Sequence, residues 1–101
     1  MKAQDENRVS LEQQVDEITW EILKPHIEKG DFFVVGQELD FLGTAVAIAE
    51  DDAEKVKVWI ELGHLTRPAP ESLNSWSLVA GKKFKFVIVK PFLLIQEIFA
   101  S

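Results

Sequence analysis

Apolar side chains recur at helical spacing near the N-terminus of the chain. The stripe comprises Leu11, Val15, Ile18 and Ile22. Their steps of four, three and four residues are typical of one face of an amphipathic helix. Ser10 and Gln13 have the spacing of a capping box, so the helix is predicted to begin at Ser10. Pro25 is expected to kink or restart it, and Gly30 to close it in a left-handed conformation.

A short β-prone run and a second helix follow. Residues 32–35 (Phe-Phe-Val-Val) have the composition of a buried strand. Asp40 is a favourable N-cap for a helix over residues 41–49, which is rich in alanine and apolar residues. Its narrow alanine face would let another element approach closely.

The acidic pair Asp51-Asp52 interrupts this apolar pattern. Asp51 and Glu54 again have N-cap spacing, which predicts that a new helix begins here, and Gly63 is placed to end it. The apolar positions that this helix is expected to bury are Val56, Trp59 and Ile60. Two short helices that meet at a polar break form a corner of the helix-turn-helix kind.

The last third of the chain is predicted to be mainly extended. Residues 64–67 form a short strand that prolines stop, and residues 71–80 form a short helix. From Lys82 onward the chain has strand periodicity. Phe84, Phe86 and Ile88 alternate with Lys83, Lys85, Val87 and Val89. Pro91 interrupts this strand, so it is expected to be an edge strand, to carry a bulge or to split in two. The apolar run over residues 92–95 is predicted to continue in an extended conformation.

The predicted order is helix, strand, helix, helix, strand, short helix, strand. This order predicts one small α/β domain of the α+β type, with the winged-helix-like order in which a helical corner packs on a small antiparallel sheet. Residues 10–101 are expected to form that domain, and the polar residues 1–9 to be frayed or disordered.

Composition limits the classes of protein that remain. The chain has 101 residues, enough for a single domain with a core, and it contains no cysteine, which excludes disulfides and thiol nucleophiles. It has no apolar run long enough to span a membrane and no apolar signal core, so we expect a cytoplasmic protein that does not contact membranes.

Charge is distributed unevenly along the chain. The net charge is −6, but residues 1–62 carry six basic and 15 acidic residues, whereas residues 63–101 carry five basic and two acidic residues. The acidic excess in residues 1–62 argues against non-specific binding to nucleic acid, because such binding is driven by Lys and Arg side chains that neutralise the phosphates.

The chain resembles a family of small uncharacterised bacterial proteins, a domain of unknown function found in cyanobacteria and proteobacteria. The resemblance covers roughly residues 20–97. It rests on Trp20-Glu21-Ile22, Gly30, Leu39-Asp40, Ala45, Ala47, Ala49, Asp51-Asp52, Val56, Trp59, Gly63 and the closing segment from Val87 to Glu97. Phe92 stands where the family has Trp. The resemblance implies no activity, because none is assigned to the family.

Motifs that would indicate an enzyme, a metal site or a cofactor are lacking in the sequence. His26 and His64 do not have the spacing of metal ligands, and no nucleophile elbow or glycine-rich nucleotide loop occurs. Asp51 and Asp52 have carboxylates that suit Ca²⁺ or Mg²⁺, but helix capping explains them without an ion. We therefore expect a non-catalytic protein with no cofactor.

Two kinds of binding surface are consistent with the sequence. The leading hypothesis is a protein-interaction module, either a homodimer through an exposed C-terminal edge strand or a binder of another protein. Its candidate contact residues are Trp76, Phe92, Leu94 and Phe99. The alternative is a winged-helix-like DNA-binding regulator. Its candidate contact residues are Lys55, Lys57, Arg67, Lys82, Lys83 and Lys85.

Overall fold

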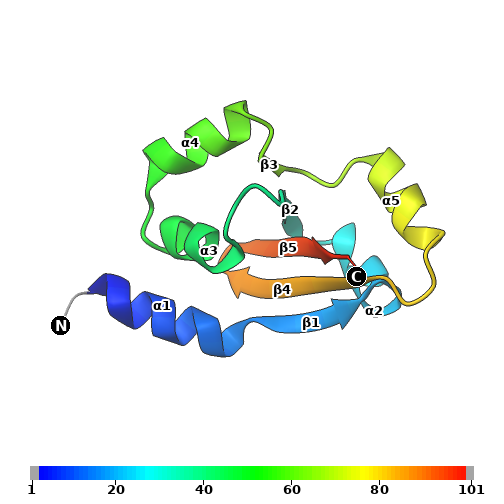
Figure 1. Ribbon diagram of the computed structural model, residues 1–101, viewed down its shortest axis with the longest axis horizontal. Helices are drawn as coiled ribbons and strands as arrows, with labels where there is room; N and C mark the ends of the chain where they lie inside the picture. Colours follow the sequence, from blue (N-terminus) through cyan, green and yellow to red (C-terminus); the bar gives the residue numbers. More distant parts are fainter. Residues whose placement is uncertain (1–2, 100–101) are drawn as a thin grey trace.

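The computed structural model describes residues 3–99, and it confirms a small α+β domain (Figure 1). The elements are α1 (Ala3–Gln14), β1 (Asp16–Thr19), α2 (Trp20–Ile27), β2 (Asp31–Val35), α3 (Phe41–Ala49), α4 (Ala53–Glu61), β3 (Leu65–Thr66), α5 (Pro70–Ser77), β4 (Lys83–Val89) and β5 (Phe92–Ile98).

The strands form one sheet of five strands in the order β1-β4-β5-β2-β3. β4 and β5 make an antiparallel hairpin, as Figure 1 shows. On its other side β5 runs parallel to β2. The sheet is therefore mixed, whereas the sequence led us to expect a small antiparallel one. The parallel pair forms because β2 and β5 are both apolar enough to be buried on two faces.

Helices cover both faces of this sheet. Leu11 of α1 and Phe41 of α3 pack with Val87 and Leu94 on one face. The other face carries a second cluster, in which α2 and α5 cover the strands. That cluster comprises Trp20, Leu23, Ile27, Phe32, Trp76, Phe84 and Ile95. Successive strand residues point to opposite faces, so Leu94 and Ile95 belong to different clusters.

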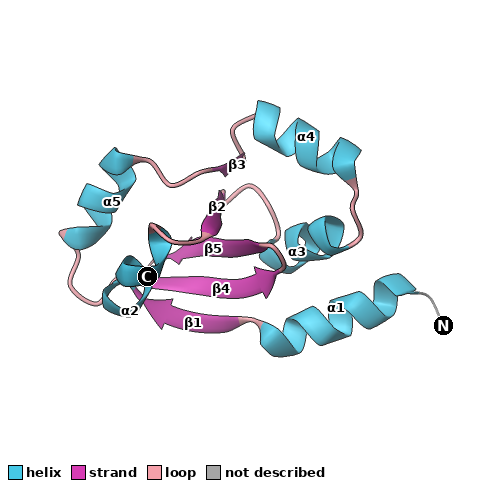
Figure 2. Ribbon diagram, turned by 180° about the vertical axis from the view of Figure 1, so that it is seen from behind, coloured by secondary structure: helices cyan, strands magenta, loops and turns pink. Residues whose placement is uncertain are grey.

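The helix predicted to begin at Ser10, to kink or restart at Pro25 and to close at Gly30 is wrong. α1 already begins at Ala3, and β1 separates it from α2, which contains Pro25 near its end (Figure 2). Ser10 is inside α1, where its hydroxyl accepts a hydrogen bond from Gln14. β1 forms because it pairs with four residues of β4, with Ile18 opposite Phe84, and this pairing outweighs the local helical periodicity. Residues 1–2 lie outside the described range, and the fraying of residues 1–9 stays a prediction.

Two of the predicted helix-terminal residues are corrected. The N-cap of α4 is Asp52 rather than Asp51, because the Asp52 carboxylate accepts from the Lys55 backbone N–H at 3.3 Å. Gly30 is not left-handed, whereas Gly63 and Gly81 are, with φ of 78° and 70°. What Gly30 provides is space, since a Cβ there would lie 2.9 Å from the Leu93 side chain.

The prediction of an exposed C-terminal edge strand is also wrong. Pro91, which follows a cis peptide bond, lies in the turn that splits the extended segment into β4 and β5. β5 pairs along one side with β4 and along the other with β2, so it has no free edge in the sheet. The outer strands are β1 and β3.

Within residues 3–99, no helix is both long enough and apolar enough to cross a membrane.

Asp40 provides a test of the local structure that positions α3. Its carboxylate accepts from the Gly43 backbone N–H at 2.8 Å, so Asp40→Ala is expected to lower the free energy of unfolding by about 1 kcal/mol. Urea denaturation monitored by circular dichroism measures this. Asp40→Asn keeps the cap but removes the charge that faces Arg8, and it should retain most of the stability. An Asn variant as unstable as the Ala variant would contradict the capping role.

Candidate functional site

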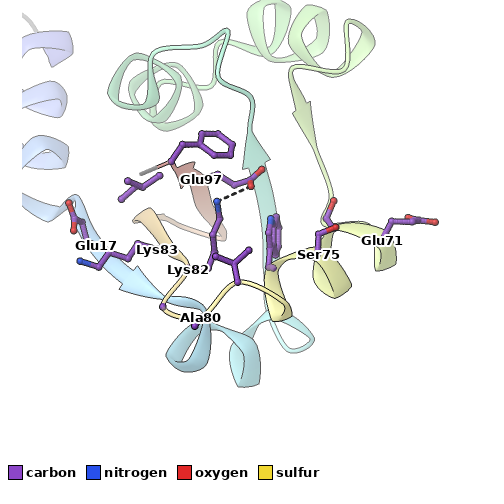
Figure 3. A pocket seen from close by; sticks show the side chains of 13 residues that line it. Glu17, Glu71, Ser75, Ala80, Lys82, Lys83 and Glu97 are labelled. Carbon is purple, nitrogen blue, oxygen red and sulfur yellow. Dashed lines mark ion pairs between the residues drawn. The ribbon is translucent and has the colours of Figure 1, made fainter. Parts of the chain in front are cut away.

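A cavity of about 870 Å³ opens where β4 begins and β5 ends (Figure 3). Three separate parts of the chain line it. They are Glu17 of β1, nine residues between Glu71 and Lys83 in α5, the turn that follows it and the start of β4, and residues 97–99 at the end of β5. We refer to it as the end-of-sheet cavity.

A buried ion pair lies in this cavity. Lys82 Nζ is 3.2 Å from Glu97 Oε1, and the Lys82 side chain is only 8% exposed. The hairpin register explains the contact, since Phe84 pairs with Glu97 and Lys82 lies two residues before Phe84 on the same face. The Lys82 backbone is fixed as well, because its carbonyl accepts from the Trp20 N–H at 2.7 Å.

Aromatic rings surround the Lys82 ammonium. Its Nζ lies 4.3 Å from the ring centroid of Phe99 and 5.8 Å from that of Phe84, within the range of cation–π attraction. The two rings differ in exposure, because Phe84 is completely buried whereas Phe99 is 61% exposed. Phe99 thus forms an accessible apolar wall over a buried charge.

Trp76 supplies a rigid wall of the same cavity. It is buried, and its indole packs edge-on against Trp20 at 5.4 Å and against Phe84 at 4.8 Å between ring centroids. Trp20 is held in turn by a hydrogen bond of 2.9 Å from its Nε1 to the hydroxyl of Ser77. This aromatic group ties α5 to α2 and to the sheet, so its neighbours hold the Trp76 side chain in place.

The other charged side chains of the cavity are more exposed. Glu17 lies opposite Lys85 in the sheet, and Figure 3 shows it beside Lys83. Glu71 points away from the cavity in the same view. The lining therefore combines three carboxylates with two ammonium groups, and one of each is joined in the buried pair.

The structure separates the four residues predicted to bind a partner. Trp76 and Phe99 both line the end-of-sheet cavity. Phe92 lies at the other end of β5, where its ring packs on Phe33 at 5.5 Å between centroids. Leu94 is completely buried in the core, so a partner cannot reach it in the folded domain.

The six residues predicted to bind nucleic acid are dispersed as well. Lys82 and Lys83 line the cavity, and Lys85 is exposed further along β4. Arg67 follows β3 at the opposite margin of the sheet, where it pairs with Asp31 at 3.3 Å and stacks on Phe33. Lys55 and Lys57 are exposed on α4. These residues do not form one continuous surface, and Lys82 is paired with Glu97.

Sequence reasoning missed Glu97, Glu17 and Ser75 as members of this site. A hairpin with its turn at Lys90-Pro91 would have predicted the contact between Glu97 and Lys82. In such a hairpin Val89 stands opposite Phe92, and the same register places Phe84 opposite Glu97. Glu17 carried no such signal, since it was assigned to a helix.

The histidines and acidic residues do not assemble a metal centre among the side chains that the structure describes. His26 is exposed at the end of α2, and His64 is half-buried before β3. Asp52 caps α4 as described above.

Comparison with known proteins places the chain in a family. Residues 6–97 match the model of a family described as "Protein of unknown function (DUF2288)", and the chain belongs to this family. It is also similar to PA1075 of Pseudomonas aeruginosa, whose structure was solved in solution by NMR. That similarity has a TM-score of 0.78 at 26% sequence identity, and it covers 99% of this chain and 92% of the other. Among curated proteins, none matches the chain significantly.

The buried ion pair should respond asymmetrically to the loss of either partner. Glu97→Gln leaves the buried Lys82 ammonium without a counter-charge and is expected to cost about 1–3 kcal/mol of stability. Lys82→Met should cost less, because it leaves a carboxylate that is 29% exposed and can be hydrated. Urea denaturation of both variants and of the double variant measures the difference. Equal losses for the two single variants would show that the burial of Lys82 does not govern the pair.

Proposed function

We propose that this member of the family is a non-catalytic protein-interaction module, which binds a segment of a partner protein in the end-of-sheet cavity. One observation carries the proposal. The cavity joins an accessible apolar rim to a fixed interior that contains a buried, charged hydrogen-bond donor.

The rim is the first support for this proposal. Phe99 and Val79 line the cavity and are 61% and 51% exposed, and Leu78, the residue before Val79, is almost fully exposed. Apolar side chains grouped at the mouth of a cavity are typical of binding surfaces, because a partner that covers them removes this area from water. Phe99 and Val79, together with Trp76, offer an apolar and aromatic pocket for an anchoring side chain.

The interior is the second support. An ammonium group has three N–H donors, and the structure gives that of Lys82 one carboxylate and two aromatic rings. This leaves donor capacity for an oxygen of a bound segment, such as a main-chain carbonyl. Because Glu97 already neutralises the charge, a neutral acceptor fits better than a second anion would.

Binding is proposed rather than catalysis because of how charged and apolar side chains are distributed in the end-of-sheet cavity. The buried ammonium of Lys82 is neutralised by the partly exposed carboxylate of Glu97, and the accessible surface around the pair is mainly apolar. A partner is also proposed to bind at the cavity and not along β5, since both edges of β5 are paired. The outer strand β1 does not invite self-pairing either, because its Asp16 and Glu17 are acidic.

Selection of displayed random peptides against the full chain tests this function. We expect the selected peptides to share an aromatic or large aliphatic anchor and to bind in fluorescence anisotropy titrations. Val79→Ser should weaken their binding by about tenfold or more, as the loss of an interface anchor does.

Ile88→Ser is the matched control for this experiment. Ile88 is 46% exposed, close to the value for Val79, but it lies near the far end of β4 and outside the cavity. Its variant should bind the selected peptides like the unmodified protein. Equal binding by both variants, or a failure of selection to enrich any peptide, would refute the proposal.

A further inference from the structure

A second cavity lies at the other end of β5, beneath α4, and has a volume of about 360 Å³. Phe92 lines this cavity, whereas Ile98 at the opposite end of the same strand lines the end-of-sheet cavity. Its walls come from α3, α4 and the strands β2, β3 and β5. They are mainly apolar and include Phe33, Ile48, Val56, Ile60, Leu65 and Phe92. We refer to it as the α4 groove.

We propose that the α4 groove docks a basic, amphipathic helical segment of a partner protein. This inference is independent of the end-of-sheet cavity, because the two sites share no lining residue.

The packing of α4 is the first observation behind the proposal. α4 has no buried residue, whereas α3 buries five. Both views show α4 at the outer margin of the molecule (Figures 1 and 2). A short amphipathic helix gains most of its stability by burying its apolar face, and here that face is only partly covered.

The residue spacing shows which side of α4 is open. Ala53, Val56 and Ile60 follow at steps of three and four, so they share the side that faces the groove. Ile60 is still 47% exposed there. A helix laid along this side would extend the apolar contact over Ile60 and the rings of Phe33 and Phe92, as helix-in-groove recognition does.

Charge complementarity identifies the chemistry of the occupant. Asp51 and Asp52, in the turn between α3 and α4, line the same groove. Lys55 lies 3.8 Å from Asp52 and offsets its charge. Among the side chains that the structure describes, the Asp51 carboxylate has neither a hydrogen bond nor an ion pair. A basic residue on the bound segment would supply that counter-charge.

The charge of the surrounding segment also disfavours a second copy of this chain. Residues 50–61 carry five acidic residues and two lysines. Two such segments brought together would place like charges close to one another, which costs affinity. A cationic segment instead gains from the same field, and its association should weaken as salt rises.

Titration of the full chain with designed peptides tests the proposal. The probe is a fluorescein-labelled amphipathic helix of leucine and lysine, ~18 residues long so that it makes about five helical turns. A peptide of the same composition with its periodicity scrambled controls for charge alone, and a leucine–glutamate helix controls for apolar contact alone. We expect the leucine–lysine helix to bind at least about tenfold more tightly than either control in fluorescence anisotropy.

Variants of the groove then locate the binding. Ile60→Ser should weaken binding of the leucine–lysine helix by about tenfold, and Asp51→Asn should weaken it several-fold while flattening its salt dependence. Ile60→Met should restore affinity, which separates lost contact from lost folding. Val79→Ser should have no effect, so that this site and the end-of-sheet cavity can fail separately.

Three outcomes would overturn the proposal. Binding of the scrambled peptide as tight as that of the helix would mean attraction by charge alone. An unchanged affinity in Ile60→Ser would place the peptide elsewhere on the protein. A dimer of the free protein in sedimentation that Ile60→Ser dissociates would mean that the occupant is a second copy of the chain.

Discussion

The pairing of β5 on both of its edges is the constraint on which the rest of the structure depends. β4 and β2 hold this strand by antiparallel and parallel hydrogen bonds, and its side chains enter the core on both faces of the sheet. Leu94 and Ile95 are completely buried on opposite sides. Each face therefore needs its own helical cover, which α1 and α3 supply on one side and α2 and α5 on the other.

Where local signals and the global fold agree, the sequence was sufficient to predict the structure. Asp40 caps α3 as expected, Gly63 ends α4 in the left-handed conformation, and the strand at residues 32–35 lies in β2. The failures share one cause, which is pairing between distant segments. Nothing local to residues 16–19 reveals that β4 offers them an open edge, and nothing in the C-terminal run reveals that β2 lies parallel to it.

The candidate site also depends on contacts between distant segments, which the sequence alone does not reveal. Lys82, Trp76 and Phe99 were each singled out from the sequence, but under two different hypotheses. The structure joins them in one cavity because α5 is clamped by stacked aromatic rings while the hairpin register brings Glu97 to Lys82. A basic residue in an alternating strand looks solvated in the sequence, and only the register shows that this lysine is buried.

The hairpin register also restricts how the length of this protein can change during evolution. Fifteen positions separate Lys82 from Glu97, and the turn at Lys90-Pro91 fixes which residues of β4 and β5 stand opposite each other. A single-residue insertion within β5 would exchange the faces of every residue beyond it, which would turn Glu97 away from the lysine. Substitutions in β4 and β5 can be absorbed one at a time, but we expect insertions and deletions to be eliminated there and to accumulate in the loops instead.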